Sequence, residues 1–315
     1  MNNIRVSVVM GVYNEKLEWL KECVDSVLNQ TYKGFEFVIV LDNPSNTILK
    51  KYLVDLEKKD NRIKLLINKK NIGIIDSANR GIEFASGEYI ARMDADDICT
   101  NNRLQEQLEF LDDNPKIHLV GSKMIFIDEN GNKLYEDKYK LKDFNQIREH
   151  IKYCSALSQP TFMFRKKTIV EIGGYRNAYC AEDYDLCMRL VERGYEITNI
   201  QKVLVYYRVR ANGISVGKRR YQLTATVYLQ KKYVYYLKNN IDLFNEKELQ
   251  RLMKKDDTKL GTYIEKLNIR ADKNKHNKIK RLTYISMLFI ISNKYRIYYI
   301  HRFKLKLYLK KIDLL

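Results

Sequence analysis

The chain has 315 residues, 45% of them hydrophobic and 30% charged, which suits a folded protein with a sizeable core and one or two domains. Its longest apolar stretch, near residues 284–291, is too short to cross a bilayer, which takes about 20 residues, so a multi-span membrane protein is excluded. Residues 1–200 hold 29 Lys+Arg against 31 Asp+Glu, whereas residues 201–315 hold 28 against 8, so the net charge of +18 comes from the last third alone.

Roughly the first 110 residues alternate between strand patterns and helix patterns. In chain order we expect a strand and then a helix, four times over, at residues 6–10, 17–28, 35–41, 47–56, 63–67, 74–84, 88–93 and 102–111. Alternation at this spacing predicts an α/β fold with a mainly parallel sheet flanked by helices. Further on we expect strands at 117–127 and 203–208, a helix at 182–193 ended by Gly194, and a mainly helical region from about residue 218.

Polar side chains follow three of these strands at the point where each one ends. Asn14 follows the first strand, Asp42 the second, and Asp94, Asp96 and Asp97 the fourth. These groups are expected to converge, because the carboxyl ends of parallel strands share one edge of the sheet and ligands bind beyond it. A divalent cation would relieve the repulsion among the clustered carboxylates, and Mg²⁺ or Mn²⁺ commonly accompanies a phosphate-bearing substrate. The alternative is an acidic surface turn, in which Asp97 caps the next helix or binds loop amides.

A second acidic pair, Glu182 and Asp183, opens the helix predicted at 182–193. Asp183 precedes the apolar residues Leu186 and Cys187 by three and four positions, so we expect it on the inward face of that helix. The positive end of the helix dipole keeps such a carboxylate ionised, and an ionised carboxylate can take a proton from a hydroxyl. The alternative is that the two residues only cap the helix.

Nine short motifs, spread in order over residues 7–183, resemble glycosyltransferase family 2, whose members are inverting nucleotide-sugar enzymes with the GT-A fold. They are Ser7–Glu15, Ser26–Tyr32, Phe35–Asp42, Asn71–Gly73, Asn79–Gly81, Gly87–Ile90, Met93–Asp97, Gly173–Tyr175 and Glu182–Asp183. The resemblance, which extends over about residues 5–215, implies a GT-A (Rossmann-like) domain at residues 1–215, with a nucleotide-binding half at 1–110 and an acceptor half at 111–215. Residues 216–315 would then form a basic helical extension.

The resemblance also implies roles for individual residues. Asp96, together with Asp94, would hold Mn²⁺ or Mg²⁺ on the donor diphosphate, and Asp183 would be the general base, helped by Glu182. The residues expected to bind the UDP-sugar are Val12, Tyr13, Asn14, Asp42, Asn71, Asn79, Asp94, Arg208 and Arg210. The residues expected on the acceptor side are Gln159, Gly174 and Tyr175.

Some of these positions depart from the family pattern or have a simpler explanation. The loop after Asp42 continues Asn43-Pro44 where the family usually has Asp-Gly. Arg210 stands where a metal-binding His is common, and an Arg would contact the diphosphate instead. Tyr13 and Tyr175 could equally be packing residues. Arg80 could either bind the diphosphate or be a solvated helix charge.

The implied reaction is transfer of one sugar from a UDP-sugar to a saccharide acceptor, which we expect to be linked to a lipid. The implied pathway is bacterial surface-polysaccharide synthesis. Trp19 is the only tryptophan, which excludes the Gln-x-x-Arg-Trp signature of processive synthases. Two alternatives stay open at this point: a nucleotidyltransferase, and a nucleic-acid-binding protein that uses the basic last third.

The basic last third interleaves Lys and Arg with Tyr and Phe, which is typical of segments lying on an anionic membrane surface. This composition has two other interpretations: nucleic-acid binding, or a packed extension with a solvated basic face. Of these partners, we expect no nucleic acid.

Five cysteines show no metal-binding spacing, and the first residues lack the apolar core of a signal peptide. We therefore expect a cytoplasmic protein, peripheral on the inner face of the cell membrane.

Overall fold

The computed structural model describes residues 4–137, 141, 143–210, 218–256, 258–274 and 276–311. The chain divides into two compact units. The first, here called the sheet unit, comprises Met1–Arg148, Ser155–Arg176 and Leu186–Arg210. The second, here called the helical unit, comprises Glu149–Cys154, Asn177–Asp185 and Ala211–Leu315. The helical unit therefore includes two short segments that precede the basic last third.

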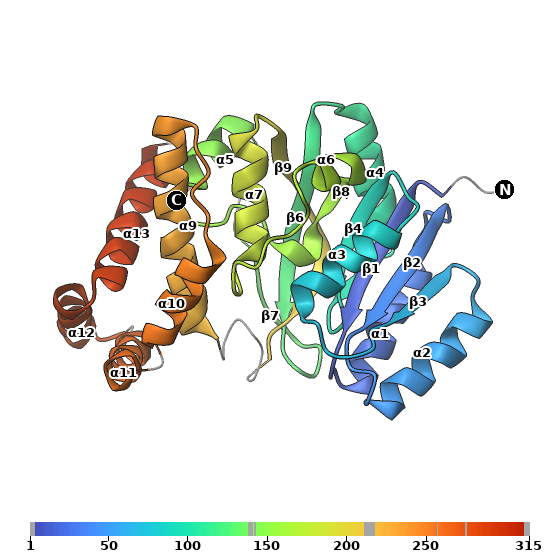
Figure 1. The fold of residues 1–315 in the computed structure, drawn as a ribbon, viewed down its shortest axis with the longest axis horizontal. Helices are drawn as coiled ribbons and strands as arrows, with labels where there is room; N and C mark the ends of the chain where they lie inside the picture. Colours follow the sequence, from blue (N-terminus) through green and yellow to red (C-terminus); the bar gives the residue numbers. More distant parts are fainter. Residues whose placement is uncertain are drawn as a thin grey trace. The chain divides into compact units, whose positions relative to one another are not determined.

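In the described chain, nine strands form one mixed sheet in the order β3-β2-β1-β4-β8-β6-β9-β5, with β7 paired to β6 (Figure 1). The strands are β1 (Val6–Val12), β2 (Phe35–Leu41), β3 (Ile63–Ile67), β4 (Tyr89–Asp94), β5 (Ile98–Cys99), β6 (Ile117–Ile127), β7 (Lys133–Glu136), β8 (Met163–Arg165) and β9 (Glu196–Arg208). The helices that accompany them are α1 (Leu17–Leu28), α2 (Thr47–Lys59), α3 (Ile74–Phe84), α4 (Arg103–Asp113), α5 (Phe144–His150), η1 (Gln159–Thr161), α6 (Lys166–Glu171) and α7 (Glu182–Glu192).

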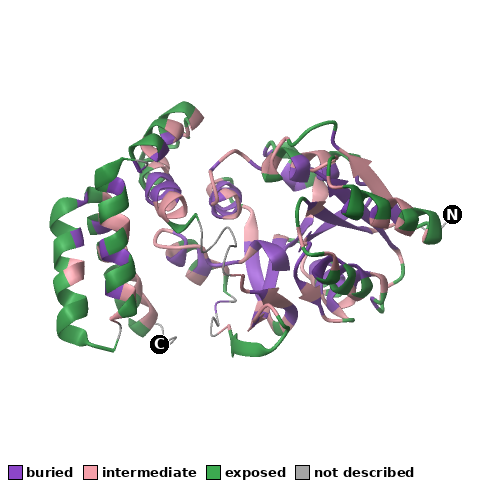
Figure 2. Cartoon of the chain, turned by 90° about the horizontal axis from the view of Figure 1, so that it is seen from below, coloured by how far each residue is buried: buried purple, intermediate pink, exposed green. Residues whose placement is uncertain are grey.

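The parallel half of the sheet confirms the predicted α/β fold. Strand β1 pairs in parallel with β2 and β4, and β2 pairs in parallel with β3. Every residue of β2 is buried, as is all of β1 except Gly11, because helices cover this part of the sheet (Figure 2). Each buried Val, Ile or Leu side chain contributes about 1.5–3 kcal/mol relative to an exposed one, so these strands form the main core.

The other half of the sheet differs from the expectation in its short strands. β8 runs antiparallel between β4 and β6, and the two-residue β5 pairs antiparallel with β9. β9 begins at Glu196, seven residues before the predicted start, and its pairing with β6 shifts register near Ser122. Strands of two or three residues have too few positions to show an alternation of polar and apolar side chains.

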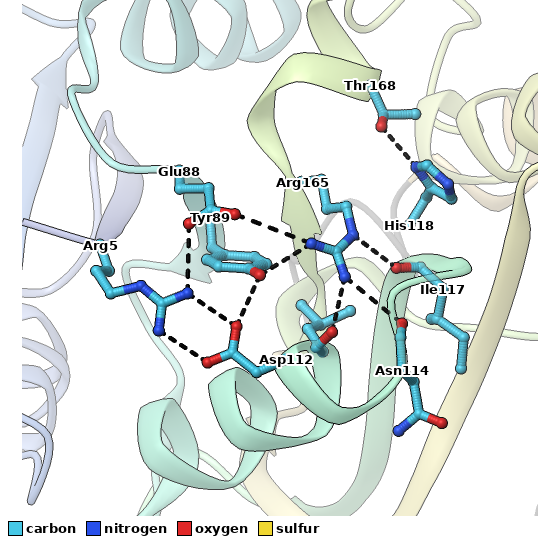
Figure 3. Close-up of polar contacts among 10 residues, drawn as sticks. Arg5, Glu88, Tyr89, Asp112, Asn114, Ile117, His118, Arg165 and Thr168 are labelled. Carbon is cyan, nitrogen blue, oxygen red and sulfur yellow. Dashed lines mark hydrogen bonds and ion pairs between the residues drawn. The ribbon is translucent and has the colours of Figure 1, made fainter.

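A polar network joins the amino ends of β1 and β4 to helix α4 (Figure 3). The Arg5 guanidinium donates to both carboxylate oxygens of Asp112 at 2.8 Å, and the Tyr89 hydroxyl donates to the same carboxylate at 2.9 Å. Arg165 Nη1 in turn donates to the Tyr89 hydroxyl at 2.9 Å. Arg5 lowers the pKa of Asp112, so the pair stays ionised. This network lies at the edge opposite the strand ends that carry Asp42 and Asp94, and it stabilises the fold.

Among its described residues, the helical unit contains five helices from the last third of the chain. They are α9 (Arg219–Asn239), α10 (Glu246–Asp256), α11 (Lys259–Lys273), α12 (Lys278–Ile291) and α13 (Asn293–Lys311). Leu267, Leu288 and Tyr295 form a small apolar cluster between α11, α12 and α13. Among the described residues, no helix combines the length and the apolar character that crossing a bilayer requires.

An ion pair with little exposure to solvent connects three of these helices. Lys294 Nζ, on α13, lies 2.5 Å from Asp256 Oδ1 on α10 and 2.8 Å from Thr224 Oγ1 on α9. Burial lowers the pKa of Lys294, and Asp256 opposes this by stabilising the charged ammonium.

We expect Asp256→Ala to lower the free energy of unfolding by about 3–5 kcal/mol, because it leaves the largely buried Lys294 ammonium without its carboxylate counterion. Urea unfolding followed by circular dichroism measures this loss. The matched control is Asp272→Ala, which removes a half-exposed pair with Arg219 and should cost less than about 1 kcal/mol. Equal losses in the two variants would contradict a special role for the buried pair.

Candidate active site

The carboxyl ends of β1, β2 and β4 lie side by side at one edge of the sheet unit (Figure 1). In the register of the sheet, Val12 pairs with Leu41 and Gly11 pairs with Asp94. The residues that follow these strands, Asn14, Asp42 and Asp96, are therefore neighbours at this edge, as the sequence predicts.

The acidic cluster after β4 is crowded and largely removed from water. Asp96 is 7% exposed, Asp97 is fully buried, and Asp94 is half-buried. Burial raises the pKa of all three carboxyls: that of Asp96 to about 6, and those of Asp94 and Asp97 above their usual range. A cation placed against Asp94 and Asp96 would oppose this shift.

Arg210, just after β9, supplies such a cation from the chain itself. Its Nε atom lies 2.7 Å from Asp96 Oδ2, and its charge lowers the pKa of Asp96 against the effect of burial. The side chain is 29% exposed, so it is accessible from outside. Arg210 thus contacts the carboxylate that the family resemblance assigns to the metal.

The fit of a metal ion depends on how many ligands the protein must supply. In the described part of the chain, no group of three or more His, Cys, Asp or Glu side chains is arranged to hold a metal. Mg²⁺ beside a nucleotide commonly uses one or two carboxylates and takes its other ligands from phosphates and water. Asp96 and Asp94, two crowded carboxylates at the open edge, fit a metal bound in that way.

The side chains of Arg208 and Asp97 are used in contacts within the fold and do not point to the open edge of the sheet. Arg208 is buried; its Nε donates to the Asp96 carbonyl at 2.9 Å and its Nη2 lies 2.5 Å from Glu22 Oε2. Asp97 Oδ1 accepts the backbone N–H of Arg208 at 2.8 Å, so it binds a backbone amide of β9 and does not cap α4. In this geometry Arg208 holds the acidic turn in place, whereas Arg210 lies at its surface.

Asp42 organises the loop that leads into α3. It is buried, and its carboxylate accepts from the Ile72 and Gly73 backbone N–H groups, each at 2.8 Å, and from Asn68 Nδ2 at 2.7 Å. Gly73 has φ +92°, a backbone that favours glycine, as expected for this helix start. Asn71 Oδ1 accepts the same Gly73 N–H at 2.9 Å.

Asn68 is a site residue that the sequence reasoning missed. It is buried directly after β3, in the position that Asp42 occupies after β2. A search for polar residues directly after each predicted strand would therefore have included it. Its side-chain oxygen accepts a hydrogen bond from Arg80. Arg80 therefore reaches toward this edge and is not simply a solvated helix charge.

The loop after β1 is the exposed part of the site. Val12 is buried, whereas the Tyr13 and Asn14 side chains are exposed. The Tyr13 ring is therefore not packed in the core. Asn14 Oδ1 accepts from Asn43 Nδ2 at 2.7 Å and from Asn46 Nδ2 at 3.2 Å, which ties this loop to the segment after β2.

Two residues expected to contact substrate are used inside the fold instead. Asn79 Nδ2 donates to the Tyr175 carbonyl at 2.9 Å, and Asn79 Oδ1 accepts the Tyr175 N–H at 2.8 Å. The Tyr175 ring is buried, 5.9 Å from the Arg92 guanidinium, so of its two readings the structure shows core packing. Gly174, with φ +67°, permits this clamp, because a Cβ there would come within 2.6 Å of Asn79 Oδ1.

Gln159 stands at the start of η1 in the sheet unit. It is 9% exposed, and its Oε1 atom is buried without a hydrogen-bond partner in the described structure. A buried amide oxygen in that state is available to a donor from a ligand or from water.

Glu182 and Asp183 belong to the helical unit and form the first turn of α7. Both are half-buried, whereas Leu186, Cys187 and Leu190, further along the helix, are fully buried. The predicted apolar face is therefore confirmed, but Asp183 is more accessible than predicted, because the buried position in this turn is taken by Tyr184. A partly accessible carboxylate at a helix N-terminus suits a group that exchanges protons with a substrate.

Comparisons with known proteins agree on one family. A family model described as Glycosyl transferase family 2 matches residues 7–173. An uncharacterized glycosyltransferase of Methanocaldococcus jannaschii is 36% identical over 243 residues, which is 75% of this chain and 79% of that protein. The amylovoran biosynthesis glycosyltransferase AmsE of Erwinia amylovora is 32% identical over 68% of this chain and 79% of its own length.

Two further proteins extend the comparison. The O-antigen biosynthesis glycosyltransferase WbnJ of Escherichia coli is 30% identical over 72% of this chain and 88% of its own length. Among solved structures, residues 1–349 of S. aureus TarS in complex with UDP align with a TM-score of 0.58 and 17% identity, over 93% of this chain and 89% of that one. That likeness supports the GT-A-like fold, and the sequence matches show that this chain is a glycosyltransferase of family 2.

Proposed function

We propose that this glycosyltransferase moves one sugar from a UDP-sugar to a saccharide hydroxyl, with inversion and with the help of a divalent metal. The observation that carries the proposal is the carboxylate cluster of Asp94 and Asp96 at the carboxyl edge of the sheet, beside the accessible guanidinium of Arg210. Membership in the family favours this activity over a nucleotidyltransferase and over a nucleic-acid-binding protein.

We assign the donor nucleotide to the edge formed by β1, β2 and β4. Asp42 is placed to accept a base N–H, since each carboxylate oxygen can accept more than one hydrogen bond. Val12, Tyr13 and Asn14 would line the base and ribose, and Asn71 would border the same loop. A UDP complex is known for TarS, which shares the fold, and this supports UDP as the nucleotide.

Asp96 and Asp94 would hold the metal, Mn²⁺ or Mg²⁺, which when bound neutralises charge on the departing diphosphate. A metal there would compete with Arg210 for the Asp96 carboxylate, because Arg210 Nε lies 2.7 Å from Asp96 Oδ2. The planar guanidinium of Arg210 can also pair with phosphate oxygens through two parallel hydrogen bonds. Arg208 and Asp97 keep the acidic turn fixed, since their contacts are with backbone and with Glu22.

Asp183 would act as the general base. The acceptor oxygen forms a bond to the anomeric carbon, the bond from that carbon to the diphosphate oxygen breaks, and the acceptor proton passes to Asp183. Attack opposite to the leaving group inverts the anomeric configuration. Glu182 would orient the acceptor or the base, and Gln159, through its unpaired Oε1, is a further candidate contact for an acceptor hydroxyl. In this proposal Asn79, Gly174 and Tyr175 support the site from within the fold.

We propose residues 1–215 as the catalytic part and residues 216–315 as the basic helical extension. Amylovoran and O-antigen synthesis are named for two relatives, which supports a surface-polysaccharide pathway for this enzyme. Such acceptors are commonly carried on a lipid, so we place the enzyme on the cytoplasmic face of the cell membrane.

Removal of divalent metal tests the proposal. We expect EDTA to lower UDP release from the UDP-sugar substrate by about 100-fold or more, because a bound metal supplies several kcal/mol of transition-state stabilisation. Added Mn²⁺ or Mg²⁺ should restore the rate. A panel of UDP-sugars and acceptors, assayed for UDP release, provides the measurement. Unchanged turnover in EDTA would contradict the metal assignment, and turnover of a different nucleotide-sugar alone would contradict UDP.

A further inference from the structure

The outer face of α12 carries a row of large apolar side chains. Ile279 is 79% exposed, Ile290 is 72% exposed, and Leu282 and Phe289 are also exposed. In chain order, Ile279, Leu282, Phe289 and Ile290 are separated by three, seven and one positions. These separations place all four on one side of the helix, with the small Ser286 between them. A contiguous exposed apolar row of this kind marks an interaction surface in a soluble protein.

The opposite side of α12 already has a partner within the protein. Leu288 is fully buried, and Tyr284 packs against the cluster of Leu267 and Tyr295. α12 is therefore apolar on its inner face and again on its outer face, and most of its residues are exposed (Figure 2). Packing within the protein explains the first of these faces and leaves the second unexplained.

α13 repeats the pattern. Ile300, Phe303 and Leu307 are exposed and follow one another at spacings of three and four, so they too share one side of their helix. Phe303 is 64% exposed. The exposed apolar residues of α12, with Lys278, Lys280 and Arg281 beside them in its first turn, are here called the apolar–basic surface, and α13 carries a second row of the same kind.

The charge of this segment has a single sign. Residues 278–311 contain ten Lys and Arg and no Asp or Glu. On α12, Lys278, Lys280 and Arg281 are all exposed in the first turn, next to Ile279 and Leu282. Whatever covers the apolar residues must therefore also accept a high density of positive charge.

These two properties together select the partner. A second copy of the chain would bring two equally basic segments into contact, which like-charge repulsion disfavours. Nucleic acid would satisfy the charge, but its phosphate backbone offers little to exposed Ile and Phe side chains. The interface of an anionic bilayer offers both acyl chains for the apolar residues and negative headgroups for the Lys and Arg residues.

We infer that the apolar–basic surface docks on an anionic lipid bilayer, with Ile279 and Ile290 of α12 entering the acyl region. The inference rests on the proposed function only in that a lipid-linked acceptor would lie in that same membrane. Binding of the protein to vesicles needs no nucleotide, and transfer to a water-soluble acceptor needs no vesicle. The two proposals can therefore fail separately.

The test uses the full chain and vesicles of phosphatidylcholine with about 30% phosphatidylglycerol. We expect Ile279→Asp/Ile290→Asp to weaken binding about 100-fold in flotation or sedimentation assays, because it places charge where acyl chains would lie. The matched control is Ile48→Asp. The Ile48 side chain is 65% exposed on α2 of the sheet unit, outside the apolar–basic surface, so this variant should bind vesicles as the parent does. Circular dichroism melts and transfer to a soluble acceptor should be unchanged in both variants.

A second variant tests the charge component. Lys278→Gln/Lys280→Gln/Arg281→Gln should bind phosphatidylglycerol vesicles at least about 10-fold more weakly, and binding of the parent should fall as salt rises. Undiminished vesicle binding by the aspartate variant would overturn the inference. So would binding that the parent shows only to nucleic acid, or a parent dimer that the aspartate variant abolishes.

Discussion

Replacing Asp183 by Asn is expected to lower kcat for sugar transfer by about 10²- to 10⁴-fold while leaving the affinity for UDP within about 2-fold of the parent. The amide has the size of the carboxylate but cannot take the acceptor proton. It also keeps the ability to accept a hydrogen bond in the first turn of α7. The change therefore separates proton transfer from helix capping. Steady-state kinetics and calorimetric titration with UDP and Mn²⁺ provide the two measurements.

The other end of the same helix offers a matched control for Asp183. Glu192→Gln changes a half-buried carboxylate in the last turn of α7 and should leave kcat within about 2-fold. If Asp183→Asn lowered the melting temperature and UDP affinity as strongly as kcat, the capping role would be sufficient and the general-base assignment would fail.

The second large effect is expected from Asp96→Asn. This change removes the charge that would hold the metal, so we expect the affinity for UDP in the presence of Mn²⁺ to fall by about 100-fold and transfer to be lost. Affinity for UDP in EDTA should not fall, because without metal a carboxylate beside the diphosphate only repels it. Calorimetric titrations of UDP with Mn²⁺ and with EDTA measure these two affinities separately.

The same variant should not lower the stability of the protein, although it lowers the affinity for UDP with metal. Burial raises the pKa of Asp96 to about 6, above its ordinary value of 3.8, so the ionised form is disfavoured in the folded protein. The cost is absent below pH about 3.8, appears as pH rises toward 6, and is fully present above it. Without metal at pH 7.5, Asp96→Asn should therefore melt no lower than the parent, even though the contact with Arg210 is altered.

Asp113→Asn is the matched control, because Asp113 is an exposed carboxylate of the sheet unit at the end of α4. It should change neither nucleotide affinity nor stability measurably. Tight Mn²⁺-dependent binding of UDP by Asp96→Asn would show that another group holds the metal.

The parallel half of the fold could be predicted from sequence nearly to the residue. Strands at 35–41 and 63–67 and helices at 17–28 and 74–84 have the predicted bounds, because each carries a long run with one clear period. β8 and β5 have three and two residues, so they have no measurable period. In β9 the polar pair Gln201 and Lys202 interrupts the apolar pattern, and the predicted strand therefore began only after it.

The candidate site could be predicted as a set of strand ends, but the partner of each side chain could not. Asp42 and Asp96 are where the strand order puts them. The clamp of Asn79 on Tyr175 joins residues 96 positions apart, and no local pattern in the sequence shows such a pairing. The same is true of Arg208 on β9, whose partners Glu22 and the Asp96 carbonyl come from α1 and from the turn after β4.

The position of β9 has a consequence for how the protein is made. β9 lies between β6 and β5 in the sheet, although it is the last strand of the described chain to be synthesised. A ribosome that has completed β6 has therefore produced a long strand with an open edge, which remains unpaired until some 70 further residues have emerged. Open edges of this kind invite pairing between nascent chains. We therefore expect chaperone binding during translation to concentrate on that interval, and chains ending before Arg208 to aggregate rather than fold.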